Sequence, residues 1–209
     1  MSQTEVQLIK SGSVVDGDIV GLSSSKLSGA LPAISGSSLT GVGKVLQVVQ
    51  TIKTDISSFS TSSGAFSNTD SSFAVTITPS STSSLIYLNG FVNVAVSGAV
   101  SQVNINYRRG GADLTTAVDG GSTTSPIGDA SGNRKRVAQT GNNSDPAGNC
   151  FTLALLDKPN STSAQTYSLS LSHGSGSSRT MYINEVNGTT NSVTMVRSCS
   201  VFIAMEIAG

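Results

Sequence analysis

Two short basic clusters are the residues in this sequence best suited to bind an acidic ligand. Arginine guanidinium groups match carboxylates and phosphates, and tyrosine, asparagine, serine and glycine make an adaptable contact surface. The clusters are equally consistent with contact to acidic cell-surface glycans and with solubilising charge, or ion pairing with Asp113 and Asp129. The candidate binding residues are Tyr107, Arg108 and Arg109 in the first cluster, and Asn133, Arg134, Lys135 and Arg136 in the second.

The single histidine, His173, would have to serve any Ser-His-Asp triad. It lies in the turn-like stretch LSHGSG at residues 171–176. A Gly-x-Ser-x-Gly elbow needs a strand followed by a helix, and no stretch of the sequence predicts a helix. We therefore expect an exposed loop histidine.

Four aspartates, at positions 113, 119, 129 and 145, could in principle supply the carboxylate pair of a glycan-cleaving enzyme. Aspartate beside glycine, asparagine or proline is also ordinary turn chemistry, and the chain lacks the repeat of a long parallel β-helix. The GVGKV stretch at residues 41–45 lacks the spacing of a phosphate-binding loop. We expect no enzyme, with no catalytic, cofactor-binding or metal-binding residues, and keep a polysaccharide depolymerase as a minor alternative.

Charge is sparse and balanced. The 209 residues contain 12 basic and 12 acidic side chains, and only 11% are charged. Such a chain has no overall field to draw it to nucleic acid or to an anionic membrane. No apolar run is long enough for a membrane span, and the first ten residues do not resemble a signal peptide. The expectation is a soluble, unsecreted protein with locally recognised partners, no nucleic acid and no membrane insertion.

The two cysteines, Cys150 and Cys199, lack metal-ligand spacing. Synthesis in a reducing cytoplasm would keep them as thiols. We expect both to be buried and unpaired, although the sequence alone does not decide whether they pair.

Short runs rich in β-branched residues, separated by turn residues, begin near Lys44. In FVNVAV at residues 91–96 and VNINY at residues 103–107 apolar side chains recur at every second position, the period of a strand with one buried face. The pattern predicts an all-β fold, an antiparallel, jelly-roll-like β-sandwich. The candidate strands are residues 45–52, 73–78, 85–96, 102–108, 150–156, 165–171, 181–185 and 193–207.

The connection from Arg109 to Asn149 is unusually long and rich in glycine. Long loops in compact domains often carry function. We expect this connection, with a short hairpin around residues 114–118, to supply the contact surface.

Residues 1–43 have no long hydrophobic period but repeat a short phrase, in LSG at 27–29, ISG at 34–36 and LTG at 39–41. One such chain buries too little apolar surface to offset its ordering entropy, whereas several intertwined chains could stack these aliphatic residues. The alternative is a flexible linker. The predicted organisation is an extended, intertwined segment at residues 1–43 and a β-sandwich head at residues 44–209, in an obligate homo-oligomer, a homotrimer by preference.

Three phrases of the head occur in a characteristic order: GKVLQVVQ at 43–50, VTITPSSTSS at 75–84, and MYIN at 181–184 with AMEIA at 204–208. Together they resemble the tail-fibre and related virion domains of marine bacteriophages, including those of cyanobacteria, over residues 43–209. Residues 28–42 resemble phrases of phage fibre shafts. The family implies trimeric β-structured fibre tips and assigns no chemistry to these phrases, so no catalytic residue carries over.

The resemblance implies a structural virion protein, a tail fibre assembled in the host cytoplasm. Its N-terminal segment would join other tail or capsid proteins, and its head would recognise a glycan or protein of the host surface. The alternatives are a capsid decoration or head-fibre protein and a fibre-anchoring adaptor. The sequence names neither the receptor nor the host.

Overall fold

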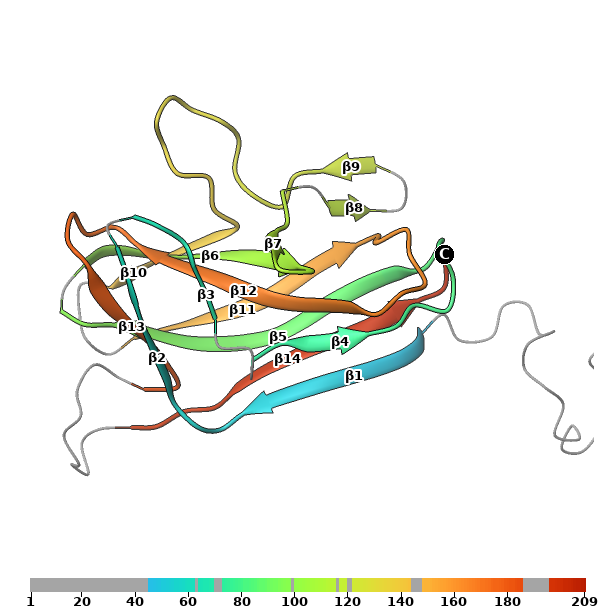
Figure 1. Cartoon of the computed structure of the whole chain (residues 1–209), viewed down its shortest axis with the longest axis horizontal. Coiled ribbons are helices and arrows are strands. Elements are labelled where there is room, and N and C mark those ends of the chain that lie inside the picture. Colours follow the sequence, from blue (N-terminus) through green and yellow to red (C-terminus); the bar gives the residue numbers. More distant parts are fainter. Residues whose placement is uncertain are drawn as a thin grey trace, which may run out of the picture. The chain divides into compact units, whose positions relative to one another are not determined.

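The computed structural model describes residues 45–62, 64–69, 73–98, 100–115, 117–119, 122–143, 148–185 and 196–209. The segment expected at residues 1–43 lies outside these residues. Within the described ranges the chain forms antiparallel strands and no helix, so the all-β sandwich is confirmed and no helix there could cross a membrane (Figure 1). The strands are β1 (Val45–Lys53), β2 (Ser57–Thr61), β3 (Ser67–Asn68), β4 (Val75–Ile77), β5 (Leu85–Val96), β6 (Val100–Arg109), β7 (Ala112–Asp113), β8 (Ala117–Asp119), β9 (Ser122–Thr124), β10 (Gln139–Asn143), β11 (Asn149–Asp157), β12 (Gln165–His173), β13 (Arg179–Ile183) and β14 (Ser200–Ile207).

The first sheet is built around β5. One side of β5 pairs with β14 through residues 85–91 and with β13 through residues 94–96, and the other side pairs with β11. Beyond them β1 pairs with β14, and β2 pairs with β13. β14 and β13 pair with successive parts of the same side of β5, and β1 and β2 pair with them in the same order. Each of these two pairs is therefore one interrupted strand. The order across the first sheet is therefore β1/β2, β13/β14, β5, β11.

The second sheet is built around β12 and β6, which pair through seven residues each. The other side of β12 pairs with β4 and β3, again one interrupted strand. The other side of β6 pairs with β10 and with the short β7. The order across the second sheet is β3/β4, β12, β6, β10.

The chain order of these strands defines a jelly roll. Without the short β7, β8 and β9, the chain has eight strands in the order β1/β2, β3/β4, β5, β6, β10, β11, β12 and β13/β14. Numbered 1 to 8 in this way, they are arranged 1-8-3-6 in the first sheet and 2-7-4-5 in the second. Consecutive strands thus alternate between sheets, except the fourth and fifth, and the last strand returns beside the first. This is the eight-stranded double Greek key expected from the sequence pattern.

The core lies between the two sheets. Alternate residues of β5, Ile86, Leu88 and Val92, are fully buried, and they face the equally buried Ile105, Leu169 and Leu171 from the second sheet. Phe73 and Phe202 pack with ring centroids 5.7 Å apart. The alternation that predicted the strands thus also places the inward side chains of both sheets in the core.

The sequence pattern did not predict the short polar strands. β10 has the sequence QTGNN, with no apolar alternation, and it lies inside the segment predicted to be a long loop. Its pairing with β6 makes it a strand. The hairpin expected at 114–118 lies later, where β8 pairs with β9. Residues 193–195 of the last predicted strand lie outside the described residues, and β14 begins at Ser200.

Candidate functional site

The seven predicted binding residues divide between strand β6 and an exposed loop. Tyr107 lies in the interior, only 2% exposed. Its hydroxyl accepts a hydrogen bond from the Ala154 backbone N–H at 2.9 Å and one from Gln139 Nε2 at 3.3 Å. Burial raises the pKa of this phenol. Tyr107 joins β6 to β11 across the open edge of the sandwich and presents no surface to a ligand.

Arg108 and Arg109 are held by carboxylates. Arg108 Nη1 lies 3.5 Å from Asp113 Oδ1, and Arg109 forms an ion pair with the buried Asp157. The Tyr167 hydroxyl also donates to Asp157, at 2.7 Å. Burial, with the Asp157 charge next, raises the pKa of Tyr167, which therefore stays protonated as a donor. Ion pairing with Asp113, an alternative that the sequence left open, holds for Arg108, whereas Arg109 pairs with Asp157, which the sequence did not indicate.

The second cluster lies on an exposed excursion of the long connection, residues 125–137, which we call the basic hairpin. Its arms are joined by Gly128 N donating to Val137 O at 3.1 Å, and its tip by Arg134 N donating to Ser131 O at 3.1 Å. Gly132 at the tip has φ of 55°, a left-handed conformation that favours glycine. Asn133 and Arg134 are exposed at this tip.

The remaining two cations anchor the basic hairpin. Arg136 donates from Nε to Gly128 O at 2.6 Å and from Nη2 to Ser125 Oγ at 3.3 Å, although the residue is exposed. Lys135 reaches back to the body, where Nζ lies 3.4 Å from Ser172 Oγ and 5.2 Å from the centroid of the Phe66 ring. Partial burial lowers the pKa of this ammonium group. The hairpin is therefore a braced structure that leaves Asn133 and Arg134 for contact.

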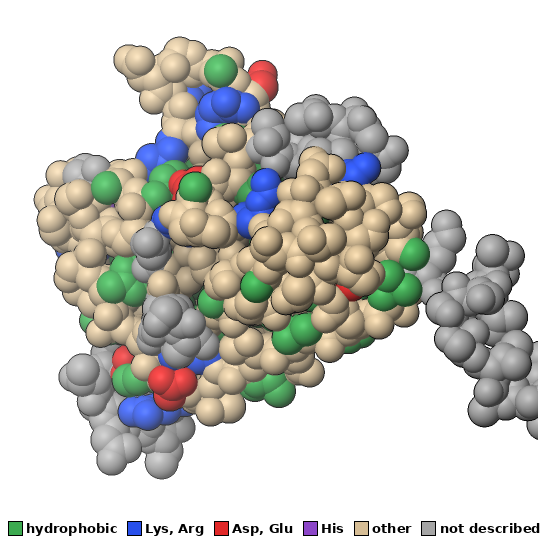
Figure 2. Space-filling model, turned by 45° about the vertical axis from the view of Figure 1, so that its right-hand side comes forward, with side chains coloured by type: hydrophobic (Ala, Val, Ile, Leu, Met, Phe, Trp, Pro, Cys, Tyr) green, Lys and Arg blue, Asp and Glu red, His purple; other side chains and the backbone are tan. Residues whose placement is uncertain are grey.

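The same connection covers the polar outer face of the second sheet. Asn106 Oδ1 accepts a hydrogen bond from the Ala138 backbone N–H at 2.8 Å, and Asp113 Oδ1 accepts one from Ser170 Oγ at 2.9 Å. This cover explains why outward polar residues of β6 and β12 are buried, among them Asn104, Asn106, Ser170 and Ser172. Figure 1 shows the connection rising from the β6 side of the sandwich, and Figure 2 shows basic side chains gathered on the upper part of the molecule.

His173 and the cysteines differ from the expectations. His173 is fully buried at the end of β12, where its Nδ1 accepts a hydrogen bond from the Ser175 backbone N–H at 3.1 Å. The prediction of an exposed loop histidine was therefore wrong. Cys150 and Cys199 are free thiols as expected, but both are exposed, so their predicted burial was wrong. Cys150 precedes the inward-facing Phe151 in β11, and strand alternation turns the cysteine outward.

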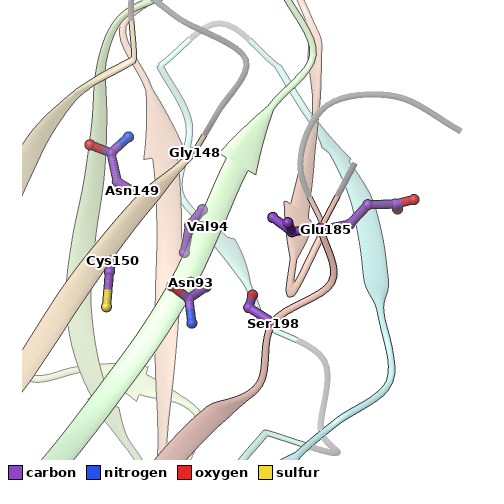
Figure 3. Close-up of a pocket in the computed structure, with 8 residues that line it drawn as sticks. Asn93, Val94, Gly148, Asn149, Cys150, Glu185 and Ser198 are labelled. Carbon is purple, nitrogen blue, oxygen red and sulfur yellow. The ribbon is translucent and has the colours of Figure 1, made fainter. Parts of the chain in front are cut away.

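A hollow of about 240 Å³ lies beside Asn93, Val94, Gly148, Asn149, Cys150, Glu185, Val196 and Ser198. Its one carboxylate, on Glu185, points away from Cys150 in Figure 3. Across the described part of the chain, no three His, Cys, Asp or Glu side chains are grouped to hold a metal ion. The basic hairpin is the candidate contact site, because it exposes Asn133 and Arg134.

The fold and this site define a jelly-roll β-sandwich that presents a braced, cationic hairpin. No protein-family model matches the chain, and no curated protein matches it. Weakly similar solved structures include two of a virus. That of infectious bursal disease virus Gt strain shares 13% identity at a TM-score of 0.40 over 86% of this chain, and that of the Gx strain shares 12% at 0.31 over 78%.

The chain spans less than half of each of those chains, 43% and 38% of their lengths. Both solved structures are of a virus.

Proposed function

We propose that the chain is a structural virion protein, a trimeric phage tail fibre whose head attaches the particle to the host cell surface. The observation that carries this proposal is the basic hairpin, a cationic tip that projects from the β-sandwich and is braced by its own hydrogen bonds. The resemblance of the three phrases to phage fibre domains supports the same reading. Residues 1–43 would join the fibre to other virion proteins.

The geometry of the hairpin suits weak, repeated contact with acidic glycans. Asn133 and Arg134 project from a turn that Arg136 braces through Gly128, so less side-chain and loop entropy is lost on binding. Three copies of this tip in one fibre would act together, and avidity makes weak individual contacts sufficient. Arginine forks provide the affinity, and asparagine provides adaptable hydrogen bonding.

Adsorption of the purified protein to host cells tests this function. The double variant Asn133→Ala/Arg134→Ala should compete with phage about tenfold less well than the parent and show a weaker dependence on salt. Its unfolding temperature should stay within about 2 °C of the parent, because neither side chain is buried. Lys158→Ala, which removes a half-buried cation just after β11, is the matched control and should compete like the parent.

Equal competition by the double variant and the parent at every salt concentration would remove the basic hairpin from the contact surface. Failure of the parent itself to compete would remove host attachment from the proposal.

A second candidate function is decoration of the capsid surface, because double-sheet jelly rolls are common in capsid proteins. The position on the virion separates the two. Gold-labelled antibodies against the head should mark the tail tip in electron micrographs of intact particles if the chain is a tail fibre, and the capsid surface if it is a decoration protein.

A further inference from the structure

The two outer faces of the sandwich differ in a way that points to a partner. The outward side chains of the second sheet are polar, and the long connection of the same chain covers many of them. The outward side chains of the first sheet are mainly apolar. Isolated apolar residues on a surface are ordinary, but a contiguous apolar face marks an interaction site.

The register of the first sheet places these apolar residues in continuous rows. Val48, Met205, Tyr87 and Leu156 stand directly opposite one another across β1, β14, β5 and β11. Ile52, Val201 and Phe91 form a second row. Since side chains on paired residues of neighbouring strands share a face, both rows lie on the side away from the core. We call this surface the apolar face; it also contains Val45, Leu46, Leu85, Ala154, Ile203 and Ile207.

No charged side chain occupies an outward position in the paired parts of these four strands. The other outward residues are Gln50, Asn89, Asn93, Cys150 and Thr152. A partner with a strong charge of either sign would therefore gain nothing from this face. A second copy of the same face meets it without repulsion.

Exposure on the apolar face is greatest along β1. Val48 is 57% exposed, Ile52 56% and Leu46 49%. β1 is also the edge strand, paired with β14 in the described structure, and it is nine residues long with neither proline nor an outward charge to protect it. Natural edge strands of that length are usually protected or paired. In Figure 2 hydrophobic side chains lie along the lower margin of the molecule, on the side where Figure 1 places β1.

The size of the apolar face fits association between copies. Four strands spaced about 4.8 Å apart, each about eight residues long at about 3.3 Å per residue, cover about 500 Å². Two such faces bury about 1,000 Å² together, the lower limit for a specific interface between proteins. A monomer that left this area open would carry a patch at the upper end of what soluble proteins show.

We propose that the apolar face is the surface through which copies of this chain associate, with β1 as its most exposed strand. In a trimer, three such faces turn toward a common axis and form a second hydrophobic core between the sandwiches. The inference rests on the proposed function for the number of copies. Its test uses neither cells nor virions, so its failure is distinct from a failure of host attachment.

The experiment uses the full-length chain with Cys199→Ser, so that Cys150 on the apolar face is the single thiol. Molar mass is measured by light scattering, and the reaction of Cys150 with a maleimide is followed over time. The test variant is Val48→Lys/Ile52→Lys. The matched control is Thr76→Lys/Thr166→Lys, which places two lysines at exposed positions of the second sheet.

The parent and the control should have three times the chain mass of 21.2 kDa and should react at least tenfold more slowly than the test variant. The test variant should have a lower molar mass than the parent. If residues 1–43 alone hold the copies together, its molar mass should stay the same and Cys150 should react faster. A monomeric parent with a protected Cys150 overturns the proposal, because the chain's own N-terminal residues would then cover the face. A Cys150 that reacts at the same rate in parent and test variant overturns it as well.

Discussion

At the scale of single residues, the phrases that resemble phage fibres are explained by two buried polar clusters. Glu206 joins all three regions of the first cluster: it accepts hydrogen bonds from the Ser80 backbone N–H and hydroxyl at 2.6 Å each, from Ser84 at 2.7 Å and from Gln47 at 2.7 Å. Asn184 joins the second, donating to Lys53 O and Asp55 O and accepting from Ser200. These residues hold strands together through hydrogen bonds, and this structural role accounts for their positions in the phrases.

Stability should depend on Glu206 at low pH. Burial alone would raise its pKa, but the hydrogen bonds from Ser80, Gln47 and Ser84 outweigh burial and lower the pKa from 4.5 to about 2. The stabilisation is therefore complete above pH 4.5 and is lost as the pH falls toward 2. Glu206→Gln should cost about 1–3 kcal/mol at pH 7 and flatten the dependence of unfolding free energy on pH in that window. Denaturant unfolding at several pH values measures both, and an unchanged slope in the variant would contradict this role.

Asn184 should matter for hydrogen bonds as well as for backbone conformation. It is fully buried with φ of 64°, and its side chain closes the junction where β1/β2 and β13/β14 are interrupted. Asn184→Ala should lower the free energy of unfolding by about 2–3 kcal/mol, because several buried groups lose their partners. Asn160→Ala is the control, since Asn160 has φ of 52° but is exposed; it should cost less than about 1 kcal/mol. Equal losses in the two variants would assign the effect to backbone strain alone.

At the scale of elements, β5 sets the geometry of the first sheet. It pairs on both sides along most of its length, and Gly90 at its middle has φ of 135°. A Cβ atom there would overlap the carbonyl oxygen of Val201 on β14. Glycine is therefore required at this point by both conformation and space.

Gly90→Ala should consequently separate β14 from β5 and cost more than about 3 kcal/mol, enough to abolish folding of a marginally stable head. Gly176→Ala is the matched control, because a Cβ atom there meets nothing within 4 Å. Circular dichroism during thermal unfolding compares the two. A Gly90→Ala protein that melts with the parent would show that β5 and β14 can shift apart at little cost.

At the scale of the whole molecule, association through the apolar face should couple folding to concentration. A folded state that is bound to other copies gains stability by mass action. The unfolding temperature of the parent should rise by several degrees between about 1 and 100 μM, and that of Val48→Lys/Ile52→Lys should rise less. Differential scanning fluorimetry over this range provides the measurement, and an unfolding temperature that is independent of concentration in the parent would contradict association.

Apolar alternation along the chain is enough to predict the strands that carry it, and hence the class of fold. β5 was predicted with its observed bounds, residues 85–96, because FVNVAV and its neighbours carry the period of two that a sheet with one buried face requires. Strands without that signal, such as β10, were missed, since backbone pairing to a neighbour can create a strand from any residues that tolerate it.

Which faces and which basic residues remain exposed depends on how the sheets and connections pack. Alternation shows that Tyr107 and Arg108 point to opposite sides of β6, but it does not show which side is the core or that the long connection covers the other. The exposure of Cys150, the burial of His173 and the open apolar face follow from contacts between segments far apart in the chain. Such contacts depend on how the sheets stack and where the connections pass, and local sequence carries no record of either.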